Sequence, residues 1–146
     1  TLLRKDFVLD EYMLAESRAH GADLVLLMVS VLGDRTGEMA GLAFRHRLEP
    51  LVEARNPEEI AIAVRSGARM IGINNRDLDT LTVDLSTGER LLPLLPPGVV
   101  PVVESGISKA EEVRRLHKAG ARLFLIGESL AVASNPADTI RGYMGK

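Results

Sequence analysis

Polar side chains close several apolar segments of this sequence, and their types suit acid–base chemistry. Lys5, Glu53, Asn74 and Glu104 each stand at the end of a short apolar run. A lysine buried near other cations or in an apolar mouth has a lowered pKa and can donate a proton near neutral pH. A carboxylate that ends a buried strand is costly unless it is paired or used. Lys5 and Glu53 therefore indicate an acid and a base, with a surface lysine and an ion pair from Glu53 to Arg55 or a lysine as the structural alternative.

The segment 74–78 reads Asn-Asn-Arg-Asp-Leu. Turns often use asparagine, so a plain loop with a surface ion pair between Arg76 and Asp77 is one interpretation. An arginine at the mouth of a site also suits a carboxylate or a phosphate, because its planar fork gives two parallel hydrogen bonds. The sequence alone leaves both interpretations open.

Two glycine turns follow apolar runs near the end of the sequence, Glu-Ser-Gly-Ile-Ser at 104–108 and Ile-Gly-Glu-Ser at 126–129. Glycine lets backbone N–H groups approach an anion, and a helix N-terminus adds a positive dipole end. Each turn alone could be an ordinary helix cap, but the pair favours a phosphate site. The predicted phosphate-binding residues are Ser105, Gly106, Gly127 and Glu128. Glu128 fits such a site only through its N–H group, with its side chain pointing away.

A repeated phrase locates the elements that must position these side chains. Gly-Ala-Asp or Gly-Ala-Arg occurs at 21–23, 67–69 and 120–122, each time before a short apolar run. The glycine suits the left-handed end of a helix, and the run suits a strand buried on both faces of a parallel sheet. The predicted strands are 1–4, 24–29, 48–54, 70–73, 99–104 and 123–126.

Helix start signals lie between these runs. The predicted N-cap residues are Asp10 or Asp6, Asn56, Ser108 and Asn135. Proline directly after both asparagines suits the first helical position, and Ser108 with Glu111 three residues later resembles a capping box. A short helix is expected over 36–47. Strand and helix alternate throughout, which implies parallel strands joined by right-handed crossovers.

Two α/β architectures fit this alternation, an open doubly wound sheet and a (β/α)8 TIM barrel. The open sheet predicts a glycine-rich dinucleotide fingerprint after an early strand, which this sequence lacks. The barrel predicts polar residues at the ends of many successive strands, as found here. A complete barrel has eight strands and roughly 250 residues. We therefore predict one incomplete TIM-barrel domain over residues 1–146, equivalent to strands three to eight, with the first two βα units absent.

Composition narrows the class of function. A net charge of −2 with scattered basic residues disfavours nucleic-acid binding. Without cysteine there is no disulfide framework or thiolate metal site. The histidines, His20, His46 and His117, lack metal-ligand spacing and are expected as helix caps or surface residues. No apolar run approaches the roughly 20 residues that span a bilayer, and the first residues lack the layout of a secretory signal, so we expect a cytoplasmic enzyme without a membrane partner.

Five motifs together resemble the indole-3-glycerol phosphate synthase family. They occur in that family's order, with similar spacing, over essentially the whole chain. Any one motif is weak, but five in sequence are highly specific. The motifs are Leu-Arg-Lys-Asp-Phe at 3–7, Leu-Val-Glu at 51–53, Ile-Gly-Ile-Asn-Asn-Arg-Asp-Leu at 71–78, Glu-Ser-Gly-Ile at 104–107 and Ile-Gly-Glu-Ser-Leu at 126–130.

The resemblance implies a carbon–carbon lyase of tryptophan biosynthesis. Such an enzyme closes the ring of 1-(2-carboxyphenylamino)-1-deoxyribulose 5-phosphate and releases carbon dioxide and water to give indole-3-glycerol phosphate. The resemblance implies no cofactor and no metal. Ring closure needs an acid at the carbonyl and anchors for the two anionic ends of one molecule, in agreement with the side chains described above.

The resemblance also assigns roles to residues of this sequence. Lys5 is similar to the general acid that protonates the substrate carbonyl. Glu53 is similar to the carboxylate that acts as a base or stabilises cationic intermediates. The substrate-binding positions are Phe7 and Leu26 at the aromatic ring, Asn74 and Arg76 near the anthranilate end, Glu104, and the phosphate cradle of Ser105, Gly106, Gly127 and Glu128.

The family carries a further active-site glutamate and lysine on its first strand, which has no counterpart here. We therefore expect little turnover by this chain alone, and recovery when an N-terminal fragment completes the barrel. A second hypothesis is a non-catalytic module that binds phosphate esters or self-associates through the open edges of its sheet. A third is another phosphate-binding barrel enzyme, such as phosphoribosylanthranilate isomerase. That reaction expects a different acid–base pair and gives no reason for the motifs at 4–7 and 74–77 together.

Overall fold

Six parallel strands form one sheet in the computed structural model, which describes residues 1–78 and 80–145. The strands pair in sequence order, and every pairing is parallel. They are β1 (Leu3–Arg4), β2 (Leu24–Met28), β3 (Glu49–Ala54), β4 (Met70–Asn74), β5 (Val100–Glu104) and β6 (Leu123–Leu125). The predicted α/β class and all six predicted strands are confirmed, with bounds that differ by two residues or fewer.

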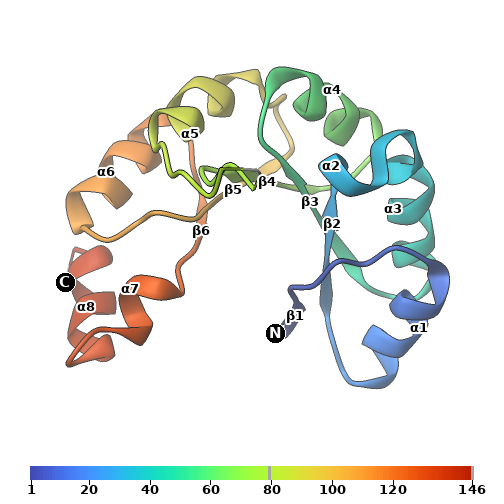
Figure 1. Ribbon diagram of the computed structural model, residues 1–146, viewed down its shortest axis with the longest axis horizontal. Helices are drawn as coiled ribbons and strands as arrows, with labels where there is room; N and C mark the ends of the chain where they lie inside the picture. Colours follow the sequence, from blue (N-terminus) through green and yellow to red (C-terminus); the bar gives the residue numbers. More distant parts are fainter. Residues whose placement is uncertain (79, 146) are drawn as a thin grey trace.

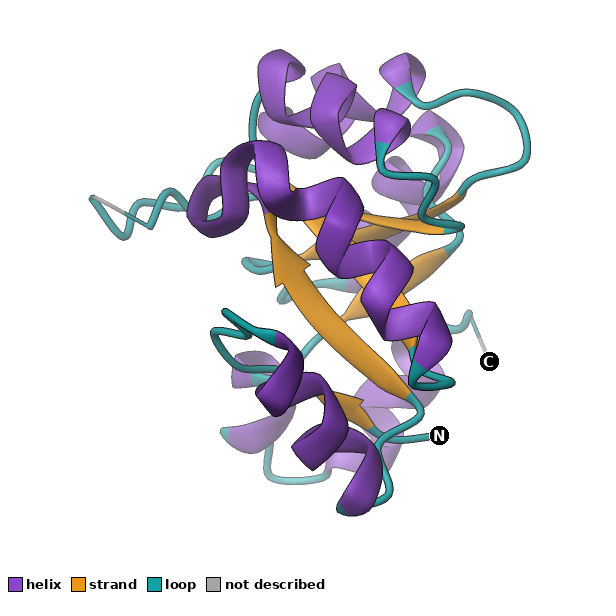
Figure 2. Cartoon of the chain, turned by 90° about the vertical axis from the view of Figure 1, so that its right-hand side faces the viewer, coloured by secondary structure: helices purple, strands orange, loops and turns teal. Residues whose placement is uncertain are grey.

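Helices follow the strands and cover the outer, convex side of the sheet (Figure 1). They are α1 (Glu11–Ala19), α2 (Val29–Leu32), α3 (Thr36–Arg45), α4 (Pro57–Arg65), α5 (Ser86–Leu91), α6 (Ala110–Ala119), α7 (Glu128–Ala131) and α8 (Pro136–Tyr143), with 3-10 turns η1 (Gly33–Arg35) and η2 (Leu92–Leu94). In Figure 2, which turns the molecule by a quarter, helices lie in front of the strands. This is the helix-outside layering of a TIM barrel.

The sheet curves into an open arc (Figure 1). Within the described residues, β1 pairs with β2 alone and β6 pairs with β5 alone. Each end strand therefore has one edge without a strand partner. In Figure 1, β1 near the N-terminus and the α7–α8 region near the C-terminus face each other across the opening. The observed topology is a half-barrel of six strands, as predicted.

The two faces of the sheet bury separate apolar clusters. Val52 and Ile71, both 0% exposed, belong to the larger cluster, which lies between the sheet and the helices. The buried members of the smaller cluster, on the inner face, are Leu26, Met28, Leu51 and Val102. Successive side chains of a strand point to opposite faces. Glu53 lies two residues after Leu51 and therefore shares the inner face with it.

Three of the helices, α1, α4 and α8, begin at predicted cap residues. Asp10 Oδ1 accepts the N–H of Met13 at 2.9 Å, and Asn56 Oδ1 accepts the N–H of Glu59 at 2.8 Å. Asn135 caps α8 in the same way. These side chains accept from N–H groups that have no partner inside the first turn of a helix. These three cap signals therefore fix where α1, α4 and α8 start.

The predicted capping box of Ser108 with Glu111 is wrong by one residue. The N-cap of α6 is Lys109, so the third helical position, which can reach back to the cap, falls on Glu112. Glu112 Oε2 accepts the N–H of Ser108 at 2.8 Å and that of Lys109 at 3.0 Å. One glutamate thus satisfies two backbone donors at the start of α6.

The segment between β2 and β3 differs from the prediction. Two short elements were not predicted: α2, which begins at Val29, and η1, which begins at Gly33. The next helix, α3, ends at Arg45 instead of residue 47. Val29 continues the apolar run of β2, and such a run has no period that separates strand from helix. Within residues 1–78 and 80–145, no helix has the length and apolar character needed to cross a bilayer.

Candidate active site

Three charged side chains from distant parts of the sequence meet at the C-terminal ends of the strands. Lys5 directly follows β1, Glu53 lies near the end of β3, and Glu104 is the last residue of β5. Lys5 Nζ lies 3.9 Å from Glu53 Oε2 and 3.5 Å from Glu104 Oε2. An ammonium and two carboxyl groups from non-neighbouring strands therefore lie together at one edge of the sheet.

Burial governs the charge state of this cluster. The side chains of Glu53 and Glu104 are 5% and 1% exposed, whereas that of Lys5 is 49% exposed. Burial, and then the neighbouring carboxylate of Glu53, raise the pKa of Glu104 to about 7, although Lys5 acts in the opposite direction. Two carboxyl groups therefore share one ammonium, and Glu104 can exchange a proton near neutral pH.

Lys5 is neither buried near other cations nor enclosed in an apolar mouth, the two surroundings considered from the sequence. The ammonium is half exposed and lies beside two carboxyl groups, not beside other cations. Of the cations considered for Glu53, Lys5 is the one within ion-pair distance, and Arg55 donates its Nε–H to Glu59 Oε1 at 3.3 Å. The geometry thus favours Lys5 as a charged donor held in place by its acidic neighbours.

A pocket of about 730 Å³ adjoins this cluster. The predicted site residues that line it are Lys5, Arg76, Glu104, Ser105, Gly106, Gly127 and Glu128. Further lining residues include Ile107, Ser108 and Ser129 in the two glycine-turn segments, and Val83 in the loop between β4 and α5. The volume lies in the range typical of small-molecule sites.

The two glycine turns form one wall of this pocket. Ser129 Oγ donates to the carbonyl of Ile107 at 2.9 Å and so ties the turn after β6 to the turn after β5. Ser105 and Gly106 have φ of 67° and 79°, so two successive residues adopt left-handed backbone. A Cβ at Gly106 would clash with Val83 Cγ1. Only glycine fits both the conformation and the space at that position.

Arg76 links the loop after β4 to the start of α7. Its Nη2 donates to Glu128 Oε2 at 3.1 Å, and its Nη1 donates to the carbonyl of Leu81 at 3.2 Å. Its backbone N–H donates to Asn74 Oδ1 at 2.9 Å. The side chain of Glu128, a pocket-lining residue that was expected to point away from an anion, pairs with the Arg76 guanidinium.

Asn75, which the sequence did not single out, anchors the first glycine turn. It is 3% exposed. Its Nδ2 donates to the carbonyl of Ser105 at 3.1 Å, and its Oδ1 accepts the N–H of Gly88 at 2.9 Å. An Asn-Asn pair is typical of a turn, and the sequence does not show that this one is buried. The side chain therefore holds the loop after β4 against the loop after β5.

Phe7 and Leu26 lie outside the lining of the pocket. Phe7 is 57% exposed, and Leu26 is 3% exposed within the inner apolar cluster. Apolar lining comes instead from residues such as Val83 and Leu125. Within the described chain, the apolar wall expected from Phe7 and Leu26 is thus not assembled around this pocket.

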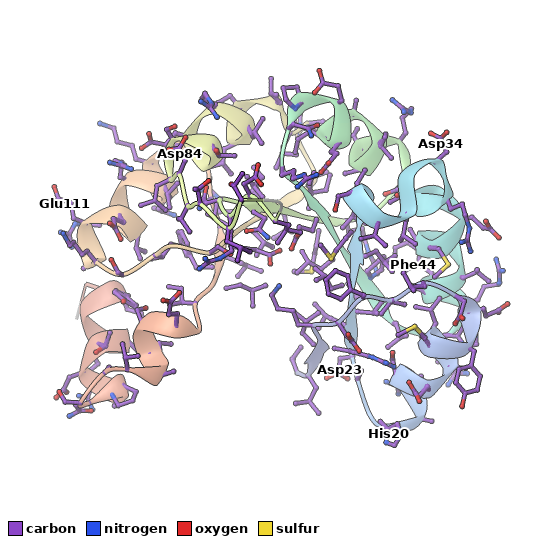
Figure 3. The ribbon with its side chains drawn as sticks, viewed as in Figure 1. His20, Asp23, Asp34, Phe44, Asp84 and Glu111 are labelled. Carbon is purple, nitrogen blue, oxygen red and sulfur yellow. The ribbon has the colours of Figure 1, made fainter. Side chains whose placement is uncertain are left out.

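The histidines lie at helix ends, as expected. His20 and His46 are the C-cap residues of α1 and α3, and His117 lies in the last turn of α6. Figure 3 shows His20 at the outer end of α1, far from the arc's centre. In the part of the chain that the structure describes, no three His, Cys, Asp or Glu side chains gather in a way that could hold a metal ion.

Known sequences match this chain over nearly its whole length. The family described as "Indole-3-glycerol phosphate synthase" matches residues 1–143. The indole-3-glycerol phosphate synthase of Dehalococcoides mccartyi is 43% identical over 141 residues, which cover 96% of this chain and 54% of the relative. That of Thermoanaerobacter sp. (strain X514) is 42% identical over 143 residues, 98% of this chain and 55% of the relative. The chain therefore spans about half the length of the curated relatives it matches.

Solved structures share the fold at low sequence identity. A 3-hexulose-6-phosphate synthase from Salmonella typhimurium matches with a TM-score of 0.81 and 17% identity, covering 98% of this chain and 71% of that one. A second 3-hexulose-6-phosphate synthase structure gives a TM-score of 0.69 and 21% identity, with 97% of this chain and 70% of that one covered. At such identities these matches show the α/β half-barrel alone.

Proposed function

The chain belongs to the indole-3-glycerol phosphate synthase family, and from that premise we propose that its site carries out this family's reaction within a completed barrel. The substrate is 1-(2-carboxyphenylamino)-1-deoxyribulose 5-phosphate, and the product is indole-3-glycerol phosphate. A carbon–carbon bond forms at the substrate carbonyl carbon, the carboxyl carbon leaves as carbon dioxide, and the carbonyl oxygen leaves as water. In this proposal the chain is part of a lyase of tryptophan biosynthesis.

One observation carries the proposal: Lys5 Nζ lies 3.9 Å from Glu53 and 3.5 Å from Glu104 beside a pocket of suitable size. A half-exposed ammonium can protonate a carbonyl oxygen as the ring closes. The carboxylate of Glu53 can stabilise positive charge on the intermediates or accept a proton in a later step. Acid and base thus come from different strands and act on one substrate.

In this proposal the phosphate of the substrate binds against the two glycine turns. Its contacts are Ser105, Gly106, Gly127 and Glu128. Support comes from their common place on the pocket wall and from the left-handed turn at 105–106, since such turns can present successive backbone N–H groups to an anion. α7 has only four residues, so its free N–H groups contribute more than a helix dipole does.

The other end of the substrate is assigned to the loop after β4 and to the inner face of the sheet. Arg76 is 32% exposed beside the pocket and can pair with the substrate carboxylate. Asn74, 5% exposed, holds the backbone of Arg76 and so positions it. Leu26 lies in the inner apolar cluster, and Phe7 is exposed and free to pack on the aromatic ring.

Completion of the barrel is part of the proposal. The arc has six strands and a free edge on each of β1 and β6, whereas a TIM barrel closes with eight. The relatives are about twice as long as this chain. We infer that two further βα units, corresponding to the N-terminal part of those relatives, pair with the two free edges. The partners are therefore this N-terminal segment and a phosphorylated small molecule.

The proposed function is tested by assaying indole-3-glycerol phosphate formation. The purified chain is measured alone and together with the N-terminal βα units of the Dehalococcoides mccartyi relative. We expect negligible turnover alone, turnover on mixing, and a loss of at least about 100-fold in Lys5→Met, because a general acid contributes that much. Lys118→Met, which changes an exposed lysine on α6, is the control and should keep full activity. Unchanged turnover in Lys5→Met would refute the role of Lys5.

Self-association without catalysis is the second candidate, and the open edges favour it. Leu2 before β1 is 63% exposed and Leu123 on β6 is 45% exposed, so each free edge carries apolar surface. Unpaired strand edges of this kind recruit other chains. Light scattering over a wide concentration range measures this, and a stable monomer at high concentration would contradict it. Phosphate-ester binding without turnover in the reconstituted mixture would favour a non-catalytic module over the catalytic role.

A further inference from the structure

Gly72, on β4, faces the buried carboxyl group of Glu104. A Cβ at Gly72 would clash with Glu104 Oε1 and lie 3.4 Å from Leu51 Cδ1. The parallel register places Gly72 between Glu53 on β3 and Val102 on β5. The φ of Gly72 lies outside the left-handed region, so its backbone does not require glycine. Glycine is needed at this position because a side chain would fill the space that the Glu104 carboxyl group occupies.

The carboxyl group in that space is short of hydrogen-bond partners. Glu104 is 1% exposed, and among the described residues neither of its oxygens has a hydrogen-bond partner, although Oε2 lies within ion-pair distance of Lys5 Nζ. Glu53 is 5% exposed, and among the same residues its buried Oε2 also lacks a hydrogen-bond partner, while lying 3.9 Å from Lys5 Nζ. An ionised carboxylate buried without hydrogen bonds is costly. A proton on Glu104 removes this cost for the more deeply buried of the two groups.

The charges around Glu104 lead to the same assignment. Four groups face the Glu104 carboxyl: Lys5 after β1, Glu53 on β3, Asn74 on β4 and Leu125 on β6. Arg76 and Glu128, elsewhere on the pocket wall, pair with each other. One ammonium and two carboxylates leave one uncompensated negative charge, which a single proton neutralises. Burial, then Glu53, raise the pKa of Glu104 to about 7, in line with that count.

We propose that Gly72 is a positioning residue, because the space beside it holds the Glu104 carboxyl where that group stores a proton. Glu53, the base of the proposed function, then faces the Lys5 ammonium without a second negative charge beside it. After Lys5 has given its proton to the substrate, the carboxyl of Glu104, 3.5 Å away, passes its proton to the Lys5 amine. The inference rests on the proposed function for its role in the reaction, but proton storage can be measured without turnover.

Carbon-13 NMR of the glutamate side-chain carboxyl groups of the purified chain, from about pH 4 to about pH 9, tests the inference. We expect one carboxyl to titrate near pH 7, and Glu104→Gln to abolish that titration. In Gly72→Ala the methyl displaces the Glu104 carboxyl toward solvent, so the midpoint falls by at least about one pH unit. Gly41→Ala is the matched control, because a Cβ there meets nothing within 4 Å, and it should leave the midpoint unchanged.

Two results would overturn the inference. One is a wild-type chain in which every glutamate titrates below about pH 5.5. The other is a folded Gly72→Ala chain whose midpoint stays where it is in the wild type. If circular dichroism shows that Gly72→Ala does not fold, Glu104→Gln decides, and a titration near pH 7 that persists in it refutes proton storage on Glu104. Loss of turnover in the completed barrel bears on the proposed function alone, so the two failures are distinguishable.

Discussion

Arg76 and Glu128 are joined beside the pocket, with Nη2 of Arg76 3.1 Å from Oε2 of Glu128. The pair connects the loop after β4 to the first residue of α7 and borders both glycine turns. The Glu128 carboxylate therefore already pairs with the Arg76 guanidinium, the group that an incoming phosphate or carboxylate would bind. Anion binding at this place requires Arg76 to exchange one anionic partner for another.

Glu128→Gln should strengthen phosphate binding, because it removes a negative charge beside the glycine turns that form the proposed phosphate site. Glu128 is 81% exposed, so the pair contributes less than about 1 kcal/mol, and affinity for inorganic phosphate should rise roughly twofold to fivefold. Calorimetric titration at fixed ionic strength measures the change. Glu38→Gln, which removes an exposed carboxylate paired with Arg35, is the control and should have no effect. Equal affinity in Glu128→Gln and the wild type would contradict the competition.

The free energy of unfolding should fall as the pH rises from about 4.5 to about 7. Burial, and secondarily Glu53, raise the folded-state pKa of Glu104 to about 7 from its ordinary value of 4.5. Between these values the folded chain binds more protons than the unfolded chain, so raising the pH favours unfolding. The loss is on the order of 3 kcal/mol, and Glu104→Gln should remove it. Urea unfolding at about pH 5 and about pH 8 measures both chains.

Glu112 provides the control for this pH dependence, because its shift has the opposite sign. Burial acts to raise the pKa of Glu112, but hydrogen bonds from Ser108 and Lys109 outweigh it and lower that pKa. Its contribution is present above the unfolded pKa and is lost only as the pH falls through the folded one. Glu112→Gln should therefore weaken the chain equally at both pH values. A wild-type chain equally stable at both would show that Glu104 ionises freely.

Gly106→Ala should destabilise the chain by roughly 2–5 kcal/mol. A left-handed backbone costs alanine about 1–2 kcal/mol, and the clash with Val83 Cγ1 adds about 1–3 kcal/mol. Gly98→Ala is the matched control, since Gly98 also has a positive φ, 94°, but nothing lies within 4 Å of its Cβ position. Urea unfolding of both variants separates the backbone cost from the clash. Equal costs would mean that Val83 does not constrain the turn.

Asn75→Ala should cost roughly 2–4 kcal/mol, because it leaves the Ser105 carbonyl and the Gly88 N–H without their buried partner. Asn135→Ala removes an exposed cap side chain and should cost about 1 kcal/mol. Thermal and urea unfolding measure both, and calorimetry should show weaker phosphate binding in Asn75→Ala alone. A cost no larger than that of Asn135→Ala would argue against an anchoring role.

The strands were predictable because each is a short apolar run that a cap or glycine signal separates from its helix. Parallel pairing in sequence order then places the ends of all strands at one edge, which is why Lys5, Glu53 and Glu104 could be expected near one another. The α2 segment could not be predicted, since its residues continue the apolar run of β2. Local spacing therefore defines the units, while their exact junctions depend on packing.

Site residues whose type suggests a chemical role could be predicted from the sequence. Residues that only hold other groups in position were much harder to predict. Arg76 and the glycine turns were recognised by type, and they do line the pocket. Asn75 and Gly72 were missed because their roles depend on what lies opposite them on other segments, Ser105 and the Glu104 carboxyl. Sequence spacing does not show such contacts between non-neighbouring elements, because they arise only when the sheet forms.

The principal apolar cluster lies outside the sheet, between the strands and the helices, and the inner cluster is small. Contacts run mostly from each strand–helix unit to the next along the arc, an arrangement akin to a short solenoid, in which stability accumulates from neighbour to neighbour. Adding or removing a unit at one end changes a single junction and leaves the others intact. Barrels of this kind can therefore arise by docking of preformed arcs, without a concerted closure of all eight strands.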